Sequence, residues 1–117
     1  MTLAEFGNIL ATSGMPVAYL AFPADNCPSM PFITFQEVGS NNFGADGKVF
    51  QKVRSMQVDL FTAGKDESAE EALENALDDF FWNKYQTVED NESCQRYTYT
   101  FDIIGGNANG EQSQIQS

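Results

Sequence analysis

Within residues 94–104, the stretch from Arg96 to Ile103 alternates strictly between polar and large apolar side chains. The apolar positions hold Tyr97, Tyr99, Phe101 and Ile103, and the positions between them hold Thr98, Thr100 and Asp102. Successive side chains of a strand point to opposite faces, so this pattern predicts a strand with one buried face. A base-stacking platform would carry basic residues among its aromatic ones, and only Arg96 is nearby. The aromatic side chains are therefore interpreted as core.

Two segments carry the spacing of amphipathic helices. The first covers residues 2–13, where Thr2 and Glu5 form a capping-box pattern. The second begins after Ser68, which with Glu71 forms a similar pattern, and ends at Trp82. Its apolar positions recur at the helical spacing: Ala69, Ala72, Leu73, Ala76, Leu77, Phe80 and Phe81.

Four further strands are expected at residues 16–22, 32–38, 49–62 and 85–89. Asp46 and Gly47 tolerate the positive φ of a tight turn, so the segment 41–50 is expected to close a long hairpin between the second and third strands. The prediction is an α+β fold with a mostly antiparallel sheet of four to five strands, two helices and a protruding hairpin. Residues 1–104 would form one domain, and 105–117, rich in Asn, Gly, Gln and Ser, a flexible tail.

The chain is strongly acidic. It has 17 acidic and 6 basic residues, and a formal net charge of −11 at pH 7. Gripping DNA requires Lys and Arg to displace counterions from the phosphates, so direct DNA binding is not expected. The polar face of the second helix carries six acidic residues: Glu67, Glu70, Glu71, Glu74, Asp78 and Asp79. This face either meets solvent or lines a channel, in which a repeated negative surface lets a duplex slide without sticking.

The residue inventory argues against an enzyme. The sequence has no His, neither Cys27 nor Cys94 has an evident base, and no phosphate-binding motif is present. A calcium-loop alignment starting at Asn42 places Val53 where a bidentate Glu is required. No cofactor, no metal and no membrane span is therefore expected, and both cysteines are expected to be reduced and buried.

The order of the elements and several segments carry a family resemblance. These segments are residues 16–19, 31–35, 41–50, 58–61, 70–77 and 96–101, of which Asn-Asn-Phe-Gly-Ala-Asp at 41–46 is the most distinctive. Together they resemble the small prophage-encoded proteins of the head–tail joining region of long-tailed phages, in particular the tail terminator or tail completion family. The resemblance covers about residues 1–104. It carries no catalytic residue.

The resemblance implies an α+β subunit whose sheet is covered on one side by helices. Six copies would form a ring at the head-proximal end of the tail tube, assembled in the bacterial cytoplasm and retained in the virion. The ring would stop tube polymerisation and present a surface to the head connector, while DNA passes through without specific binding. Its partners would be itself, the tail tube protein and the connector protein.

Within this interpretation the hairpin is expected to make axial contacts with a neighbouring ring. Phe43 and Phe50 would be anchors, with Asn41 and Asn42 as a hydrogen-bonding rim, and Asp46 and Lys48 complete the expected interface. The alternative is a hairpin tip without a partner and Phe50 folded into the core.

The lumen of the ring is expected to be lined by the acidic helix face: Glu67, Glu70, Glu71, Glu74 and Asp78. Two other functions stay open, a connector stopper or adaptor of the same neck region, and an acidic inhibitor that mimics DNA.

Overall fold

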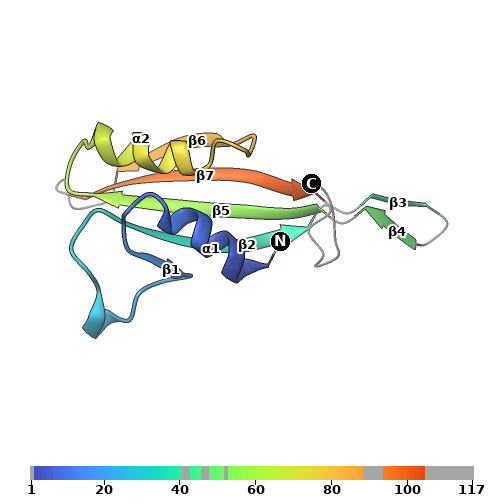
Figure 1. Ribbon diagram of the computed structural model, residues 1–117, viewed down its shortest axis with the longest axis horizontal. Helices are drawn as coiled ribbons and strands as arrows, with labels where there is room; N and C mark the ends of the chain where they lie inside the picture. Colours follow the sequence, from blue (N-terminus) through green and yellow to red (C-terminus); the bar gives the residue numbers. More distant parts are fainter. Residues whose placement is uncertain (1, 41–42, 46–47, 52, 89–93, 105–117) are drawn as a thin grey trace.

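The computed structural model describes residues 2–40, 43–45, 48–51, 53–88 and 94–104. A five-stranded sheet with the order β1-β2-β5-β7-β6 forms one layer, and two α-helices form the other (Figure 1). The elements in chain order are α1 (Leu3–Ala11), β1 (Val17–Tyr19), the 3-10 turn η1 (Ala24–Asn26), β2 (Phe32–Ser40), β3 (Phe43–Ala45), β4 (Lys48–Gln51), β5 (Val53–Thr62), α2 (Glu67–Ala76), β6 (Asn83–Val88) and β7 (Gln95–Ile104). The predicted α+β class is confirmed.

The three central strands of the sheet pair antiparallel, as does β6 with β7. At the other edge β1 runs parallel to β2, with Val17 opposite Ile33 and Tyr19 opposite Phe35. The prediction of a mostly antiparallel sheet is thus confirmed, and β1 makes the sheet mixed. The parallel direction is possible because the long connection through η1 brings the chain back to the start of β2.

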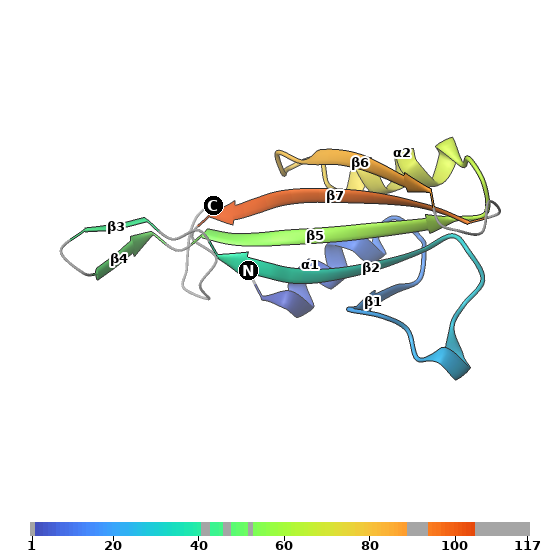
Figure 2. The same ribbon diagram turned by 180° about the vertical axis from the view of Figure 1, so that it is seen from behind.

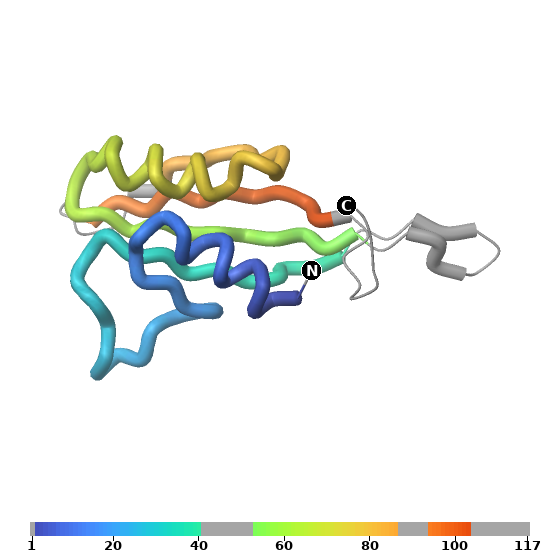
Figure 3. Tube along the Cα trace, viewed as in Figure 1, coloured from blue at the N-terminus to red at the C-terminus, as the bar shows by residue number. Residues whose placement is uncertain are grey.

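Both helices cover the same face of the sheet. In Figure 2, which shows the molecule from behind, β2, β5 and β7 lie in front of α1 and α2. The Cα trace in Figure 3 shows the two helices side by side, running roughly along the strands of one face, although more than half of the described chain separates them in sequence. In the described part of the chain, the opposite face of the sheet carries no helix.

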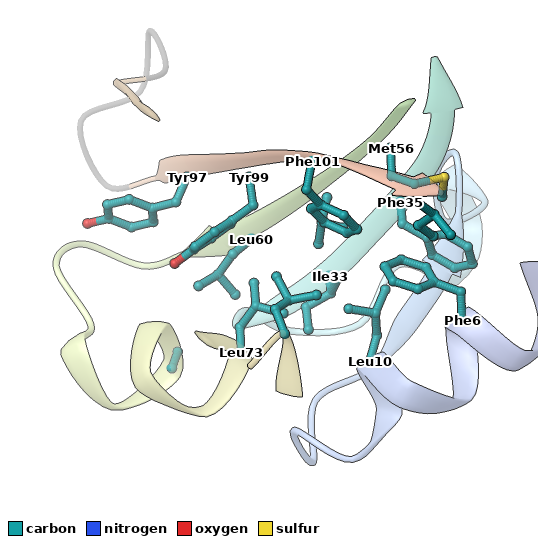
Figure 4. Close-up of a cluster of buried hydrophobic side chains, with 14 residues drawn as sticks. Phe6, Leu10, Ile33, Phe35, Met56, Leu60, Leu73, Tyr97, Tyr99 and Phe101 are labelled. Atoms are coloured by element: carbon teal, nitrogen blue, oxygen red, sulfur yellow. The ribbon is translucent and has the colours of Figure 1, made fainter. Parts of the chain in front are cut away.

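The core lies between these two layers (Figure 4). The alternating apolar side chains of β7 all belong to it, and Tyr97 and Tyr99 are 1% and 0% exposed. The ring of Phe6 on α1 contacts three other rings, those of Phe35, Phe80 and Phe101, with centroids 5.5–5.6 Å apart. Leu10, Leu73 and Leu77 fill the space between the helices and the sheet. The sequence-based assignment of the β7 aromatic residues to the core is confirmed.

The first helix begins where the sequence predicts. The backbone N–H of Glu5 donates to the Thr2 hydroxyl at 3.1 Å, and the backbone N–H of Thr2 donates to the Glu5 carboxylate at 2.6 Å. This reciprocal pair satisfies two amide groups that a helix end leaves without a partner. The helix ends at Ala11, two residues before the predicted end, and Gly14 beyond it has φ +88°.

The second helix differs from the prediction at both ends. Asp66 caps it, accepting a hydrogen bond from the backbone N–H of Ala69 at 3.1 Å, so the predicted Ser68 cap is wrong. The helix ends at Ala76 and not at Trp82. Leu77 still belongs to the core, and Phe80 packs against it from the turns that follow. The turns after the helix thus keep Leu77 and Phe80 against the sheet, whereas Phe81, which also continues the helical spacing, is exposed.

Two predicted strands also differ in length. The strand expected at 16–22 ends at Tyr19, because Leu20 has φ +69° and cannot continue it. The strand expected at 49–62 is divided into β4 and β5. In β5 the alternate residues Met56, Val58 and Leu60 are buried.

The predicted hairpin is present as a separate two-stranded sheet. Gly44 of β3 lies opposite Val49 of β4, and Ala45 opposite Lys48. Figure 1 shows this sheet beyond the ends of β2 and β5, where it extends the long axis of the molecule. Asn41, Asn42 and Asp46 of the expected interface, and the predicted tail 105–117, lie outside the described residues.

Candidate interaction surfaces

The acidic face of α2 is divided between exposed and buried carboxylates. Glu67, Glu71 and Asp78 are exposed, as is Asp79 in the following turn. Glu70 is only 4% exposed, so its expected place on an exposed acidic face is wrong. Glu74 is half-buried. The helical spacing assigned Glu70 to the polar side, but two lysines from outside the helix enclose it.

Lys84 of β6 joins two of these carboxylates. Its Nζ lies 2.5 Å from Oε1 of Glu70 and 2.7 Å from Oε2 of Glu74. Lys65, from the loop before the helix, lies 2.9 Å from the other oxygen of Glu70. Burial alone raises the pKa of Glu70, but the hydrogen bonds from Lys84 and Lys65 outweigh it and hold this pKa below its usual value. Burial likewise lowers the pKa of Lys84, and its bonds to the two carboxylates raise it overall.

Tyr99 completes this group from the sheet. Its hydroxyl donates to Oε2 of Glu74 at 2.8 Å, and burial together with this bond raises the pKa of Tyr99. The ammonium groups of Lys65 and Lys84 lie 5.2 and 5.4 Å from the ring centroid of Tyr97. This cluster, here called the lysine clamp (Lys65, Glu70, Glu74, Lys84, Tyr99), fastens α2 to β6 and β7. Its charges are compensated within the subunit, so it is interpreted as structural.

The helix-free face of the sheet is polar at its centre and aromatic at one end, where Phe32 stacks on Phe61 with ring centroids 5.1 Å apart and also contacts Phe22. At its centre Asp59 is 8% exposed and lies opposite Thr34 on β2 and Thr98 on β7. The Thr98 hydroxyl donates to one oxygen of Asp59 at 2.7 Å, and the Gln57 amide donates to the other at 3.1 Å. Nearby, the Ser55 hydroxyl donates to Asp102 at 2.9 Å. A face of this kind can stay in water and can also meet a polar protein surface.

A groove of about 550 Å³ crosses this region of the molecule near the hairpin end of the sheet. Two exposed apolar side chains belong to its lining, Val38 at 52% and Phe81 at 91% exposure. Polar groups share the lining: Ser55, Asn83, Thr100 and Asp102. Of the described residues that line the groove, Asp102 is the single charged one. Sequence reasoning missed this site because it placed Phe81 on the buried side of the helix.

The expected hairpin interface is only partly described. Phe43 lies in β3, and Lys48 and Phe50 lie in β4. The structure therefore places these three residues on the projecting ribbon, and the expected contacts of the hairpin stay predictions.

The described residues include no group of three or more His, Cys, Asp or Glu side chains placed to hold a metal ion. Cys27 is exposed and Cys94 half-buried, both with free thiols, so the expected burial of Cys27 is wrong. Among the helices of the described part, none has the length and apolar character needed to cross a bilayer.

Comparison with known proteins gives a likeness of fold. No family model matches the sequence, and no curated protein matches it. Among solved structures, the chain is similar to a chain of the virion of a native gene transfer agent particle. The TM-score is 0.60 at 10% sequence identity, and the match covers 86% of this chain and 84% of the other. At this identity the comparison shows that the two chains share a fold.

Proposed function

We propose that this chain is a structural subunit of a phage-like virion, and that it forms a ring at the head-proximal end of the tail tube. The observation that carries the proposal is the likeness of fold to a virion chain, which covers most of both molecules. The resemblance of the sequence to tail terminator proteins supports the same location. A non-enzymatic role agrees with the absence of His from the sequence.

The architecture suits a subunit of a closed ring. One face of the sheet is covered by helices, and the other carries polar side chains with an aromatic cluster at one end, so the two sides of the subunit offer different surfaces. Different surfaces favour head-to-tail contacts, which close into a ring when the rotation between neighbours permits. The hairpin β3–β4 projects from this body and would carry contacts to neighbours, with Phe43 and Phe50 as anchors and Asn41, Asn42 and Asp46 beside them.

A two-stranded ribbon has two faces and two outer edges, so the two anchors can serve two neighbours. We assign the axial contact with the adjoining tube ring to Phe43, with Asn41 and Asn42 as its polar rim. The outer edges of such a ribbon also offer unpaired backbone groups to a neighbouring strand.

In this ring the exposed carboxylates of α2 and of the turn after it would line the lumen. They are Glu67 and Glu71 in the helix and Asp78 in the turn. Glu70 and Glu74 would add little to the lumen potential, since the lysine clamp compensates them. Negative charge repels the phosphates of a passing duplex, and this repulsion keeps DNA from binding on its way through.

The test is assembly on tail tubes. The purified protein is measured by light scattering alone and after mixing with the tail tube protein of the same prophage, and tube lengths are measured by electron microscopy. A hexamer, or a monomer recruited to tube ends with shorter tubes as the result, supports the proposal. A protein that ignores tubes and leaves their growth unchanged overturns it.

Two other functions make different predictions in the same experiment. A connector stopper or adaptor would bind the head connector and leave tube growth unchanged. A DNA mimic would stay a monomer or dimer and bind a basic protein, with an affinity that falls steeply as salt rises. The net charge of −11 is the observation that keeps this last function open.

A further inference from the structure

The basic residues of this chain are unevenly distributed. Arg54 pairs with Glu37 at 3.1 Å, and Lys65 and Lys84 are engaged in the lysine clamp. Two of the remaining three, Lys48 and Lys52, fall in the hairpin segment 41–52, where Asp46 is the one acidic residue. This segment has a net charge of +1, while the rest of the chain, with 16 acidic and 4 basic residues, has −12. The hairpin is thus a cationic arm on an acidic body.

The groove is complementary to this hairpin, because it combines an apolar rim with an acidic residue. Its rim carries two apolar side chains that solvent reaches, Val38 and Phe81, and a Phe that is 91% exposed has almost none of its apolar surface removed from water. Its charged lining residue is an acid, Asp102, which the Ser55 hydroxyl holds in place with a 2.9 Å hydrogen bond. A fitting occupant therefore presents a large apolar side chain next to a cation.

The strand β4 of the hairpin has this composition. Its sequence is Lys-Val-Phe-Gln, with Lys48 and Phe50 at alternate positions. We infer that the groove bounded by Val38, Phe81 and Asp102 receives β4 of a second copy of this chain, with Phe50 against the apolar rim and Lys48 near Asp102. This inference rests on the ring assembly proposed above, and it specifies which surfaces of neighbouring copies meet.

The contact would be head-to-tail, since the arm of one copy enters the groove of the next. Repeated in one direction, such a contact generates a closed ring or a helical array, whereas a reciprocal exchange of arms between two copies would give a twofold dimer. Charge pairing would offset part of the repulsion between subunits that each carry −11. Salt would screen both this pairing and the repulsion between the acidic subunits, so the charge-exchange variants and not the salt dependence test the contact.

Charge exchange tests the contact directly. The variants Lys48→Glu and Asp102→Lys are each expected to weaken self-association at least about tenfold, measured by sedimentation velocity or light scattering. An equimolar mixture of the two variants is expected to recover it. In that mixture the new acid of the first variant meets the new lysine of the second, and the next contact pairs the unchanged Lys48 with the unchanged Asp102. Every contact in an even-numbered ring is then complementary.

A matched control adds the same charge far from the groove. Asp25 is exposed and belongs to η1, a segment that lies at the other end of the molecule from the hairpin (Figure 1). Mixing the Asp25→Lys variant with the Lys48→Glu variant is therefore expected to leave the association as weak as that of Lys48→Glu. Phe81→Ser tests the apolar rim separately and is expected to weaken association without loss of folding, which circular dichroism checks.

The possible results separate this inference from the proposed function. If the wild type assembles and caps tubes, but the mixed variants do not recover association, the inference is overturned and the proposed function stands. If the mixture recovers association while tubes are ignored, the inference is supported and the proposed function falls. A wild type that stays monomeric up to its solubility limit overturns the inference.

Discussion

Lys84 of β6 forms an ion pair with the buried carboxylate of Glu70 on α2, with 2.5 Å between Nζ and Oε1. The two residues are separated by 14 positions, and one lies in a helix and the other in an edge strand. The pair fastens the helix layer to the sheet at the strand farthest from β1. Removing one partner of a buried pair leaves the other charge without compensation.

The substitution Lys84→Met is therefore expected to lower the free energy of unfolding by about 2–3 kcal/mol. The side chain of Lys84 is 29% exposed, so the loss should be smaller than for a fully buried pair. The matched control is Lys65→Met, whose side chain is 54% exposed and which should cost less than Lys84→Met, because solvent screens its ion pair. Urea unfolding followed by circular dichroism measures both, and equal losses would contradict the central role of Lys84.

The same pair predicts a dependence of stability on pH. The pKa of Glu70 is lowered from 4.5, so the unfolded chain takes up its proton first as pH falls, and stability is lost between pH 4.5 and the folded pKa. The pKa values of Lys84 and Tyr99 are raised from 10.5 and 10.0, so the unfolded chain releases these protons first and stability falls as pH rises above 10. Glu70→Gln should flatten the acid side of a urea titration series, whereas Glu67→Gln, at an exposed position, should not.

Two phenylalanines separate the contribution of the core from that of the surface. Phe6 is 1% exposed and contacts three aromatic rings, so Phe6→Ala is expected to cost about 3–4 kcal/mol. Phe81 is 91% exposed, and Phe81→Ala is expected to change the free energy of unfolding by less than about 0.5 kcal/mol. Thermal unfolding of dilute protein measures both. A large loss for Phe81→Ala would mean that it packs against the folded chain.

Leu20 has a strained backbone. Its φ of +69° costs a non-glycine residue roughly 1–2 kcal/mol, and its side chain is 59% exposed, so little burial is lost on removing it. Leu20→Gly is expected to raise the free energy of unfolding by about 0.5–1 kcal/mol, because the relief of strain exceeds the entropy that glycine adds to the unfolded chain. The neighbouring change Ala21→Gly lacks this relief and should lower stability by a similar amount. If both substitutions change the free energy of unfolding in the same direction, the strain argument is refuted.

The sequence predicts those elements that depend on interactions between residues close together in the chain. The capping box of Thr2 and Glu5 is formed within one helical turn, and both hydrogen bonds are present. Likewise, the alternation around Tyr97 and Tyr99 reflects one buried face of a single strand, and these residues are in the core. The hairpin turn also depends on neighbouring residues, and β3 and β4 pair as expected.

What the sequence does not predict depends on contacts between distant segments. Helical spacing places Glu70 on the polar face, and its burial is tolerated because Lys84 from β6 pairs with it together with Lys65. The parallel direction of β1 follows from the path of a long irregular connection, which has no periodic signal. Phe81 continues the apolar spacing of α2, but the helix has already ended, and the turns leave this ring in solvent beside the groove.

The central position of β5 has a consequence for how the subunit opens. β5 pairs with β2 on one side and with β7 on the other along nearly its whole length, whereas β1 is held at the edge by three residue pairs. Amide hydrogens of β5 are therefore expected to exchange with solvent mainly through global unfolding, and those of β1 through local fluctuations. A subunit with this gradient can adjust its periphery to a neighbour at a small free-energy cost while its centre stays intact.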